Sequence, residues 1–175
     1  MLRPLSVSDA TGLRLLVDAE TWAGMSAPLP ADDHAMAGHL REMIDSPALL
    51  AFAVELGGRL VGRTSLYDVM PGLRVEVGNT IYARDVWGTR VNPTAKLLLL
   101  GYAFTELGVG RVALRCDHRN VRSHRAIARL GASFEGTLRR FRPAADATIA
   151  DVDYFSVLLE EWPGVRSGLE ARLAL

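Results

Sequence analysis

The feature that most constrains the fold is the stretch from Trp87 to Glu135, in which helical and strand patterns alternate. It reads as a loop, a helix, a strand, a second helix and a second strand, and polar and basic residues gather at the two helix starts. A short strand between two helices would bring their N-termini side by side. The free N–H groups and the dipole of a helix N-terminus attract anions. The stretch therefore predicts an α/β fold that holds a phosphate-bearing ligand.

The remaining pattern predicts a mixed sheet. Gly57-Gly58 and Pro71-Gly72 mark two turns between apolar runs, which indicates an antiparallel meander. We expect strands at 2–5, 49–55, 59–67, 73–82, 112–116, 134–141 and 152–159. We expect helices near 8–17, 32–44, 94–107 and 121–130, a loop at 25–30, a break at Trp162-Pro163 and a short terminal helix at 169–173. A single α/β domain spanning residues 1–175 accounts for these elements.

Charge and cysteine content exclude several classes of protein. The 20 Lys and Arg balance the 20 Asp and Glu, so no overall field favours nucleic acid or an anionic membrane. The single cysteine, Cys116, lies in an apolar alternating run and is expected to be a buried strand residue. The start of the chain lacks the apolar segment of a signal peptide, and no apolar run approaches ~18 residues. We therefore expect a cytoplasmic protein.

The two helix starts carry the candidate ligand groups. At the first, Gly88 and Asn92-Pro93 lead into a helix whose Thr94, Ala95 and Lys96 N–H groups would be free. A diphosphate cradle and an ordinary capped helix with a solvated lysine both fit this pattern. At the second, Asn120 is placed as the N-cap, which is an alternative to a ligand role. Helical spacing puts Ser123 on the inward face with Ala126, Ile127 and Leu130, and turns Arg122, Arg125 and Arg129 outward.

These residues resemble the GNAT superfamily of acyl-CoA-dependent N-acetyltransferases, in particular the RimJ/RimL-like branch of ribosomal-protein N-terminal acetyltransferases. The resemblance covers most of the chain and is strongest from Gly62 to Trp162. The matching segments are Val61-Gly62-Arg63-Thr64-Ser65-Leu66, Trp87-Gly88-Thr89, Asn92-Pro93-Thr94-Ala95-Lys96-Leu97-Leu98-Leu99, Asp117-His118-Arg119-Asn120-Val121-Arg122-Ser123, Gly131-Ala132, Glu135-Gly136-Thr137-Leu138-Arg139 and Glu161-Trp162-Pro163. It implies a mixed, mostly antiparallel sheet of six to seven strands, flanked by helices and splayed at its central parallel pair.

The resemblance also implies acetyl-CoA as co-substrate and places its binding residues. The backbone at Ile81 and Tyr82 would hold the pantetheine and polarise the thioester. Asn120 would orient the pantetheine arm, and Ser123 would assist the leaving thiolate. The cofactor loop and helix start would hold the diphosphate through Trp87, Gly88, Arg90, Val91, Asn92, Thr94, Ala95 and Lys96, joined by Arg122.

Two positions depart from the family pattern. Pro93 replaces the central glycine of the cofactor loop and cannot donate an N–H, for which Lys96 could compensate as a point charge. Ile127 occupies the position of the tyrosine that acts in the family as general acid for the departing thiolate, and isoleucine cannot supply a proton. Ser123 is the remaining hydroxyl on that face.

A general base is needed to take the proton of the attacking amine. Glu76 matches the branch's acidic position, although it could equally be a solvent-facing strand residue, and Asp68 is the weaker candidate. The four histidines show no metal-ligand spacing, so no metal is expected.

The predicted activity is transfer of an acetyl group from acetyl-CoA to a primary amine by direct attack in a ternary complex. The alternative is an acyl-CoA-binding sensor or interaction module without turnover. Trp22 and Met25 are candidates to line the acceptor pocket, although both could be core residues. The acceptor could be a protein N-terminus, an aminoglycoside, a polyamine or a free amino acid. The C-terminal strands offer a surface for a homodimer, which no sequence pattern establishes.

Overall fold

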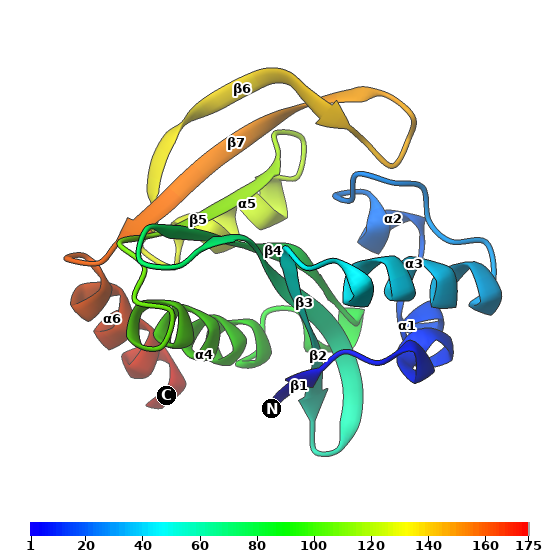
Figure 1. The fold of residues 1–175 in the computed structure, drawn as a ribbon, viewed down its shortest axis with the longest axis horizontal. Coiled ribbons are helices and arrows are strands. Elements are labelled where there is room, and N and C mark those ends of the chain that lie inside the picture. The colour runs from blue at the N-terminus through cyan, green and yellow to red at the C-terminus, as the bar shows by residue number, and fades with distance from the viewer. Residues whose placement is uncertain (175) are drawn as a thin grey trace.

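A computed structural model describes residues 1–174, and within them seven strands form one sheet in the order β1-β2-β3-β4-β5-β7-β6 (Figure 1). Antiparallel pairing joins the first four strands in sequence, namely β1 (Leu2–Pro4), β2 (Leu49–Leu56), β3 (Arg59–Met70) and β4 (Arg74–Tyr82). It also joins β5 (Arg111–Asp117) to β7 (Ile149–Leu158), and β7 to β6 (Ser133–Pro143). β4 and β5 run parallel. The predicted mixed, mostly antiparallel sheet is confirmed.

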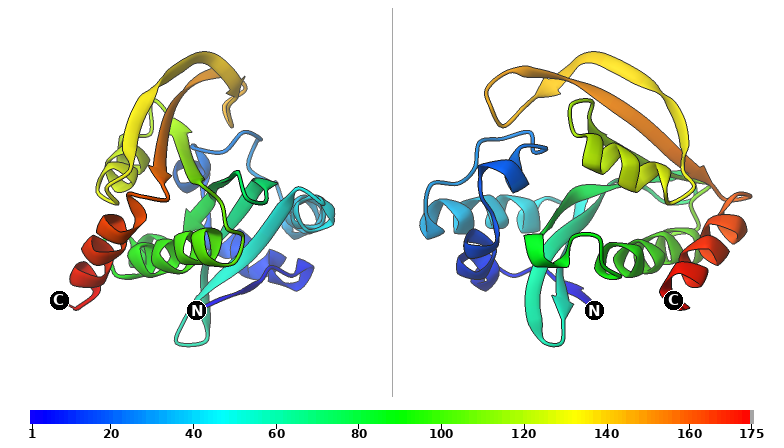
Figure 2. Two further views of the ribbon diagram at one scale, coloured as in Figure 1. Left: turned by 60° about the vertical axis from the view of Figure 1, so that its left-hand side comes forward. Right: turned by 180° about the vertical axis from the view of Figure 1, so that it is seen from behind.

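Helices cover both faces of the sheet (Figures 1 and 2). One face carries α1 (Ala10–Leu16) and α3 (Asp33–Asp45), preceded by the turn η1 (Val7–Asp9), and the other carries α4 (Val91–Thr105), α5 (Val121–Ala128) and α6 (Trp162–Ala174). Successive side chains of a strand point to opposite faces of the sheet, so both faces are apolar and both are covered. In β2, Ala53 packs in the cluster of α1 and α3, while its neighbour Val54 packs in a cluster on the opposite face. Among the helices of residues 1–174, none has the length and apolar character needed to cross a bilayer.

Three helix predictions differ from the structure. α4 begins at Val91, three residues before the predicted start, and α6 begins at Trp162, where a break was predicted. Both helices carry a proline in the first turn, where its missing N–H costs nothing. The short helix α2 (Ala19–Trp22) was not predicted, although Asp18 and Thr21 cap it reciprocally.

The central parallel pair separates after only four residues. Arg74–Val77 pair with Arg111–Leu114, and beyond this point β4 leaves β5. A bulge accompanies the departure, since Ser65 faces Gly78 while Arg63 faces Ile81, and Asn79 lies inside it with φ 51°. Gly62 permits the tight approach of β3, because a Cβ there would lie 2.1 Å from the Ile81 carbonyl oxygen. The predicted splay is therefore built into β4, with η2 (Arg84–Val86) completing the turn into α4.

The hairpin of β6 and β7 arches above α5 at the end of the sheet (Figures 1 and 2). β6 is the edge strand, and most of its residues are exposed. Its pairing with β7 shifts register twice, between Phe134 and Gly136 and between Leu138 and Arg142. The hairpin therefore curves, which brings its far end toward the loop that follows α2.

Candidate active site

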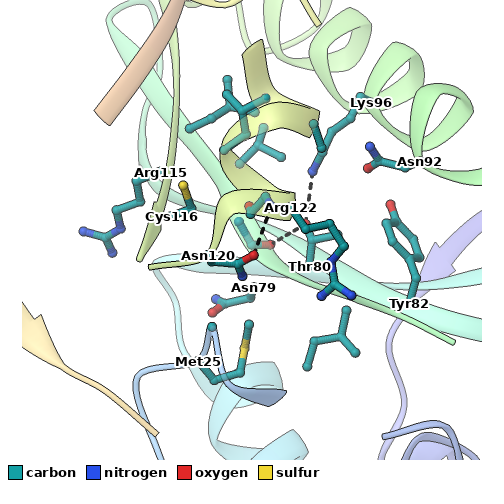
Figure 3. A pocket seen from close by; sticks show the side chains of 18 of the residues that line it. Met25, Asn79, Thr80, Tyr82, Asn92, Lys96, Arg115, Cys116, Asn120 and Arg122 are labelled. Carbon is teal, nitrogen blue, oxygen red and sulfur yellow. Dashed lines mark hydrogen bonds between the residues drawn. The ribbon is translucent and has the colours of Figure 1, made fainter. Parts of the chain in front are cut away.

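A cleft opens where β4 and β5 separate (Figure 3). Its wall is formed by these strands, the starts of α4 and α5, and the segment after α2. Nine of the predicted site residues line it, namely Ile81, Tyr82, Trp87, Gly88, Asn92, Lys96, Asn120, Arg122 and Ser123. The predicted residues that are not part of this wall are Arg90, Val91, Thr94, Ala95 and Glu76.

The early start of α4 changes which N–H groups are free. The N–H of Thr94 donates to the Arg90 carbonyl at 2.9 Å, so Thr94 lies beyond the first turn, as do Ala95 and Lys96. Val91 donates to Thr89 Oγ1 at 3.3 Å, and Pro93 has no N–H. The prediction of three free N–H groups at 94–96 is therefore wrong. Asn92 is the first-turn residue that lines the cleft and whose N–H has no intrahelical acceptor.

The side chain of Arg90 also lies elsewhere. It donates to the Leu173 carbonyl and so connects the N-terminus of α4 to α6. Val91 and Ala95 are buried core residues. These three residues thus stabilise the position of α4 and do not contact the cleft.

Lys96 is the only lysine of the chain, and it is buried against the cleft wall. Its Nζ donates to Thr80 Oγ1 at 3.0 Å, which connects α4 to the bulged part of β4 (Figure 3). Burial lowers the pKa of this ammonium group from 10.5 to about 7. The solvated lysine considered from the sequence is wrong, and the site instead holds an amine that an approaching anion would readily charge.

The start of α5 places Asn120 and Ser123 as the helical spacing predicts. Asn120 caps the helix by accepting the Ser123 N–H at 3.0 Å, and Ser123, Ile127 and Leu130 all face the cleft. Arg122 does not point outward as expected. Its guanidinium lies over the Trp87 ring, 3.4 Å from the centroid, at the edge of the cleft.

Tyr82 contributes a hydroxyl that has no hydrogen-bond partner within residues 1–174, although the oxygen is buried. Burial also raises the pKa of this phenol, so it remains a donor at neutral pH. Figure 3 shows the ring directed into the cleft near Asn92. Because a buried hydroxyl without a partner is costly, Tyr82 is a candidate donor to a ligand in the cleft.

Glu76 lies behind the wall and reaches the cleft through two neighbours. Tyr67 donates its hydroxyl to Glu76 Oε1, and Arg115 Nε lies 2.8 Å from the same carboxylate. Both neighbours line the cleft. Burial raises the pKa of Glu76, against the opposing effects of Tyr67 and Arg115. The alternative of a solvent-facing glutamate is thus excluded.

Sequence reasoning missed Tyr67 and Arg115. Tyr67 could have been found, because Tyr67 and Glu76 lie at equal separations from Pro71 and Gly72 and therefore pair across the hairpin. Asp68, the weaker base candidate, is exposed and pairs with Arg74 at 2.8 Å.

Cys116 is buried on β5, as predicted, and burial raises the pKa of its thiol to about 11. Its sulfur and ligand atoms of His124 and Asp153 lie within 4.8 Å of one another, a proximity that no sequence spacing indicated. His124 Nδ1 already bonds Asp153 at 2.8 Å, and His118 Nδ1 bonds the same carboxylate at 2.9 Å. This is a hydrogen-bonded cluster, and the expectation of no metal stays a prediction.

The two candidates for the acceptor pocket have different environments. Met25 lines the cleft. Trp22 is a core residue that donates Nε1–H to the Ala27 carbonyl at 2.8 Å and packs edge-on against His39. Its role is to fix the segment that carries Met25.

The wall fits a long ligand that carries phosphates. One end offers two cationic groups, Lys96 and Arg122, beside the N-terminus of a helix. The orphan hydroxyl of Tyr82 and the unpaired edge of β4 beyond Val77 supply donors along the cleft. These are the groups that the phosphates and amides of acetyl-CoA require.

Comparisons with known proteins agree with this geometry. Residues 1–133 match the family described as the acetyltransferase (GNAT) domain. The structure is similar to a candidate acetyltransferase from T. thermophilus, with 37% identity, a TM-score of 0.92, and coverage of 98% of this chain and 92% of that one. It is also similar to a GCN5-related N-acetyltransferase from Brucella melitensis, with 26% identity, a TM-score of 0.88, and coverage of 97% and 80%.

Two further comparisons are weaker. Mycobacterium smegmatis RimJ in complex with CoA-disulfide shares the fold, with a TM-score of 0.80 over 97% of this chain and 87% of that one, at 23% identity. An uncharacterized N-acetyltransferase p20 of Bacillus licheniformis is 32% identical over 91 residues, or 52% of this chain, and the chain spans about half the length of that relative. The family match covers most of the chain and coincides with the splayed sheet and its cleft, so the chain belongs to the GNAT acetyltransferase family.

Proposed function

We propose that the protein is an acyl-CoA-dependent N-acetyltransferase that moves an acetyl group from acetyl-CoA to a primary amine by direct attack in a ternary complex. The observation that carries this proposal is the cleft between β4 and β5, whose wall combines Lys96, Arg122 and the orphan hydroxyl of Tyr82. Family membership supports the same reaction class. We further propose that residues 1–175 act as one such domain.

Binding would divide along the cleft. Lys96, Arg122 and the Asn92 N–H hold the diphosphate end beside Trp87 and Gly88. The backbone of Ile81 and Tyr82, on the unpaired edge of β4, binds the pantetheine amides as a neighbouring strand would. The amide nitrogen of Asn120 is directed at the segment after α2, since a Cβ on Gly24 would lie 2.7 Å from it, and it orients the arm from the other side. Arg90, Val91, Thr94 and Ala95 support α4 in this proposal.

Glu76 acts as the base through Tyr67. Because the Tyr67 hydroxyl donates to Glu76 Oε1, the tyrosine oxygen can accept the proton that the amine loses while its own proton passes to the carboxylate. The amine nitrogen then forms the new bond to the carbonyl carbon, and the carbon–sulfur bond breaks. Ser123 places a hydroxyl at the departing sulfur, where the tyrosine of the family pattern is replaced by Ile127.

The finer assignment to the RimJ/RimL-like branch rests on the sequence motifs. The similarity to Mycobacterium smegmatis RimJ supports the fold alone. A protein N-terminus and a small-molecule amine are both open as acceptors, and the predicted homodimer and cytoplasmic location stay predictions.

Two measurements test the proposed function. Isothermal titration of the protein with acetyl-CoA is expected to show binding, and release of free thiol in the presence of an amine panel is expected to show turnover. The absence of binding at millimolar acetyl-CoA would refute the proposal. Binding without thiol release from any amine would instead favour the sensor or interaction module, which the apolar Ile127 at the tyrosine position permits.

A further inference from the structure

The charged side chains in the cleft wall are all cationic. Among the residues of 1–174 that line it, the ionisable groups of Asp, Glu and His are absent, and the cations are Lys96, Arg115, Arg122 and Arg142. Figure 3 shows Arg115 on the side opposite Lys96 and Tyr82. Lys96 and Arg122 serve the phosphate end in the proposed function. Arg142 contacts Gly24, the neighbour of Met25, and Arg115 lies over the Tyr67 ring. We therefore assign these two arginines to the acceptor end of the cleft.

Arg142 is held in place by backbone carbonyls. It donates to the Gly24 carbonyl at 2.8 Å and to the Pro143 carbonyl at 2.9 Å. No carboxylate within the described residues forms an ion pair with it. The nearby Asp117 is already paired with Arg119 at 2.7 Å. A guanidinium carries five N–H donors, so Arg142 keeps unused donors in the cleft.

The surroundings of Arg142 add further positive charge. Arg115 lines the same cleft as Arg142. Burial lowers the pKa of Arg142, the nearby Asp117 carboxylate raises it, and repulsion from Arg115 lowers it. Arg115 is neutralised by Glu76, but its second terminal nitrogen is free of the bonds to Glu76 and Tyr154. Behind Met25, the buried Arg63 donates to the Asn79 carbonyl and to His39. The two carboxylates near this end already have arginine partners, since Glu76 pairs with Arg115 and Asp117 with Arg119.

This charge distribution selects among amines. A polyamine or an aminoglycoside would bring further ammonium groups to a wall that already carries excess positive charge. An amine that also carries a carboxylate would place its anion on the arginines and its nitrogen toward Tyr67 and Glu76. Arginine binds carboxylates through paired, charge-assisted hydrogen bonds.

We propose that the acceptor is a small primary amine that carries a carboxylate, of the α-amino acid class, and that Arg142 binds this carboxylate with help from Arg115. The proposal rests on the proposed function. It makes Arg142 a specificity-determining residue on β6, which the curved β6–β7 hairpin brings to the segment after α2.

The test compares acceptors in matched sets. Each amino acid is assayed beside its α-carboxamide and the corresponding decarboxylated amine, all with saturating acetyl-CoA. We expect kcat/KM to be about 10- to 100-fold higher for the acid, the range that one or two charge-assisted hydrogen bonds provide. Short peptides whose only carboxylates are distant from the N-terminus should behave like the amides. Equal or better use of the amides, or of polyamines, would overturn the proposal.

Variants of Arg142 test whether this residue causes the preference for acceptors that carry a carboxylate. Arg142→Gln is expected to remove the preference by lowering kcat/KM for the acid about 10- to 100-fold while the amide is little affected, and Arg142→Lys should restore part of it. Arg139→Gln, an exposed change on the same strand, is the control. The affinity for acetyl-CoA should stay unchanged in both glutamine variants. Equal losses on every acceptor, or a selective loss of acetyl-CoA binding, would contradict the assignment.

The same design separates the two proposals. Lack of acetyl-CoA binding refutes the proposed function, whereas acetylation without a carboxylate preference refutes only the acceptor class. If acetyl-CoA binds but no amine is acetylated, the carboxylate site is tested by titration of the amino acids and their amides into the CoA complex. Tighter binding of the acid that is lost in Arg142→Gln supports the carboxylate site, and binding of neither compound overturns it.

Discussion

Replacing Lys96 by methionine should stabilise the protein, and the gain should depend on pH. Burial lowers the pKa of the Lys96 ammonium from 10.5 to about 7, so between these values the unfolded chain holds a proton that the folded chain lacks. The stability of the native protein therefore rises with pH through this window. Below pH 7 both states are protonated, and the full cost of a buried charge is present. The advantage of Lys96→Met is thus largest below pH 7 and declines toward pH 10.5.

The magnitude follows from the pKa and from one hydrogen bond. Each pKa unit corresponds to about 1.4 kcal/mol, so the buried charge costs roughly 5 kcal/mol. The variant loses the bond from Nζ to Thr80 Oγ1, worth about 1 kcal/mol, but Thr80 keeps its bond to Thr64 at 2.8 Å. Methionine has a similar length and fills the site without a charge. We expect a net gain of about 2 to 4 kcal/mol at pH 6 after this loss and local relaxation.

Urea unfolding of both proteins at pH 6, 8 and 9.5 measures this difference. Lys96 is the only lysine, and the groups that titrate elsewhere are common to both proteins and cancel. Leu98→Met, at an exposed position of the same helix, controls for the methionine itself and should show no pH dependence. A variant that is less stable at pH 6, or a difference that does not change with pH, would refute the reasoning. The variant should also bind acetyl-CoA more weakly, because the phosphate end loses a cation.

Three further substitutions test the proposed site. Ser123→Ala should lower kcat about 10- to 100-fold with little change in KM, and full turnover across the pH range would exclude Ser123 from the step that releases sulfur. Glu76→Gln should remove the acid limb of the pH–rate profile, because the raised pKa of Glu76 makes the native rate fall as the carboxylate is protonated; an unchanged profile would leave the base unidentified. Tyr82→Phe should weaken acetyl-CoA binding about 3- to 10-fold without destabilising the free protein, since the hydroxyl has no partner among residues 1–174 to lose, and unaltered affinity would mean that no ligand atom meets it.

Local patterns predicted most of the fold because the helices and strands obey their own periods. The capping role of Asn120 followed from the preference of asparagine for the N-cap, and the inward face of Ser123 and Ile127 followed from helical spacing. Asn92-Pro93 was correctly placed at the loop-to-helix junction with Pro93 suited to the first turn, but the helix was counted only from Thr94, and the structure begins it at Val91.

The acceptor end could not be predicted from local pattern. Arg142 lies 118 residues from Gly24, and only the curvature of β6 brings the two into contact. Arg122 was expected to face solvent because spacing on a helix says nothing of a neighbouring Trp87. Contacts of this kind depend on how distant segments pack, and a single sequence does not specify them.

The brief parallel contact between β4 and β5 has a consequence for how the molecule opens. Within residues 1–174, four residue pairs in this ladder are all that joins β1–β4 to β5–β7 in the sheet. The strands β1–β4 and β5–β7 therefore form two parts of the molecule that are joined by this short ladder and connected by α4. A ligand lying in the cleft would extend this contact, because it would form hydrogen bonds with the backbone of β4 where β5 is missing. Between Gly78 and Tyr82, the amide hydrogens on the edge of β4 away from β3 should accordingly exchange faster than the amides paired with β3, and slow most when the ligand is bound.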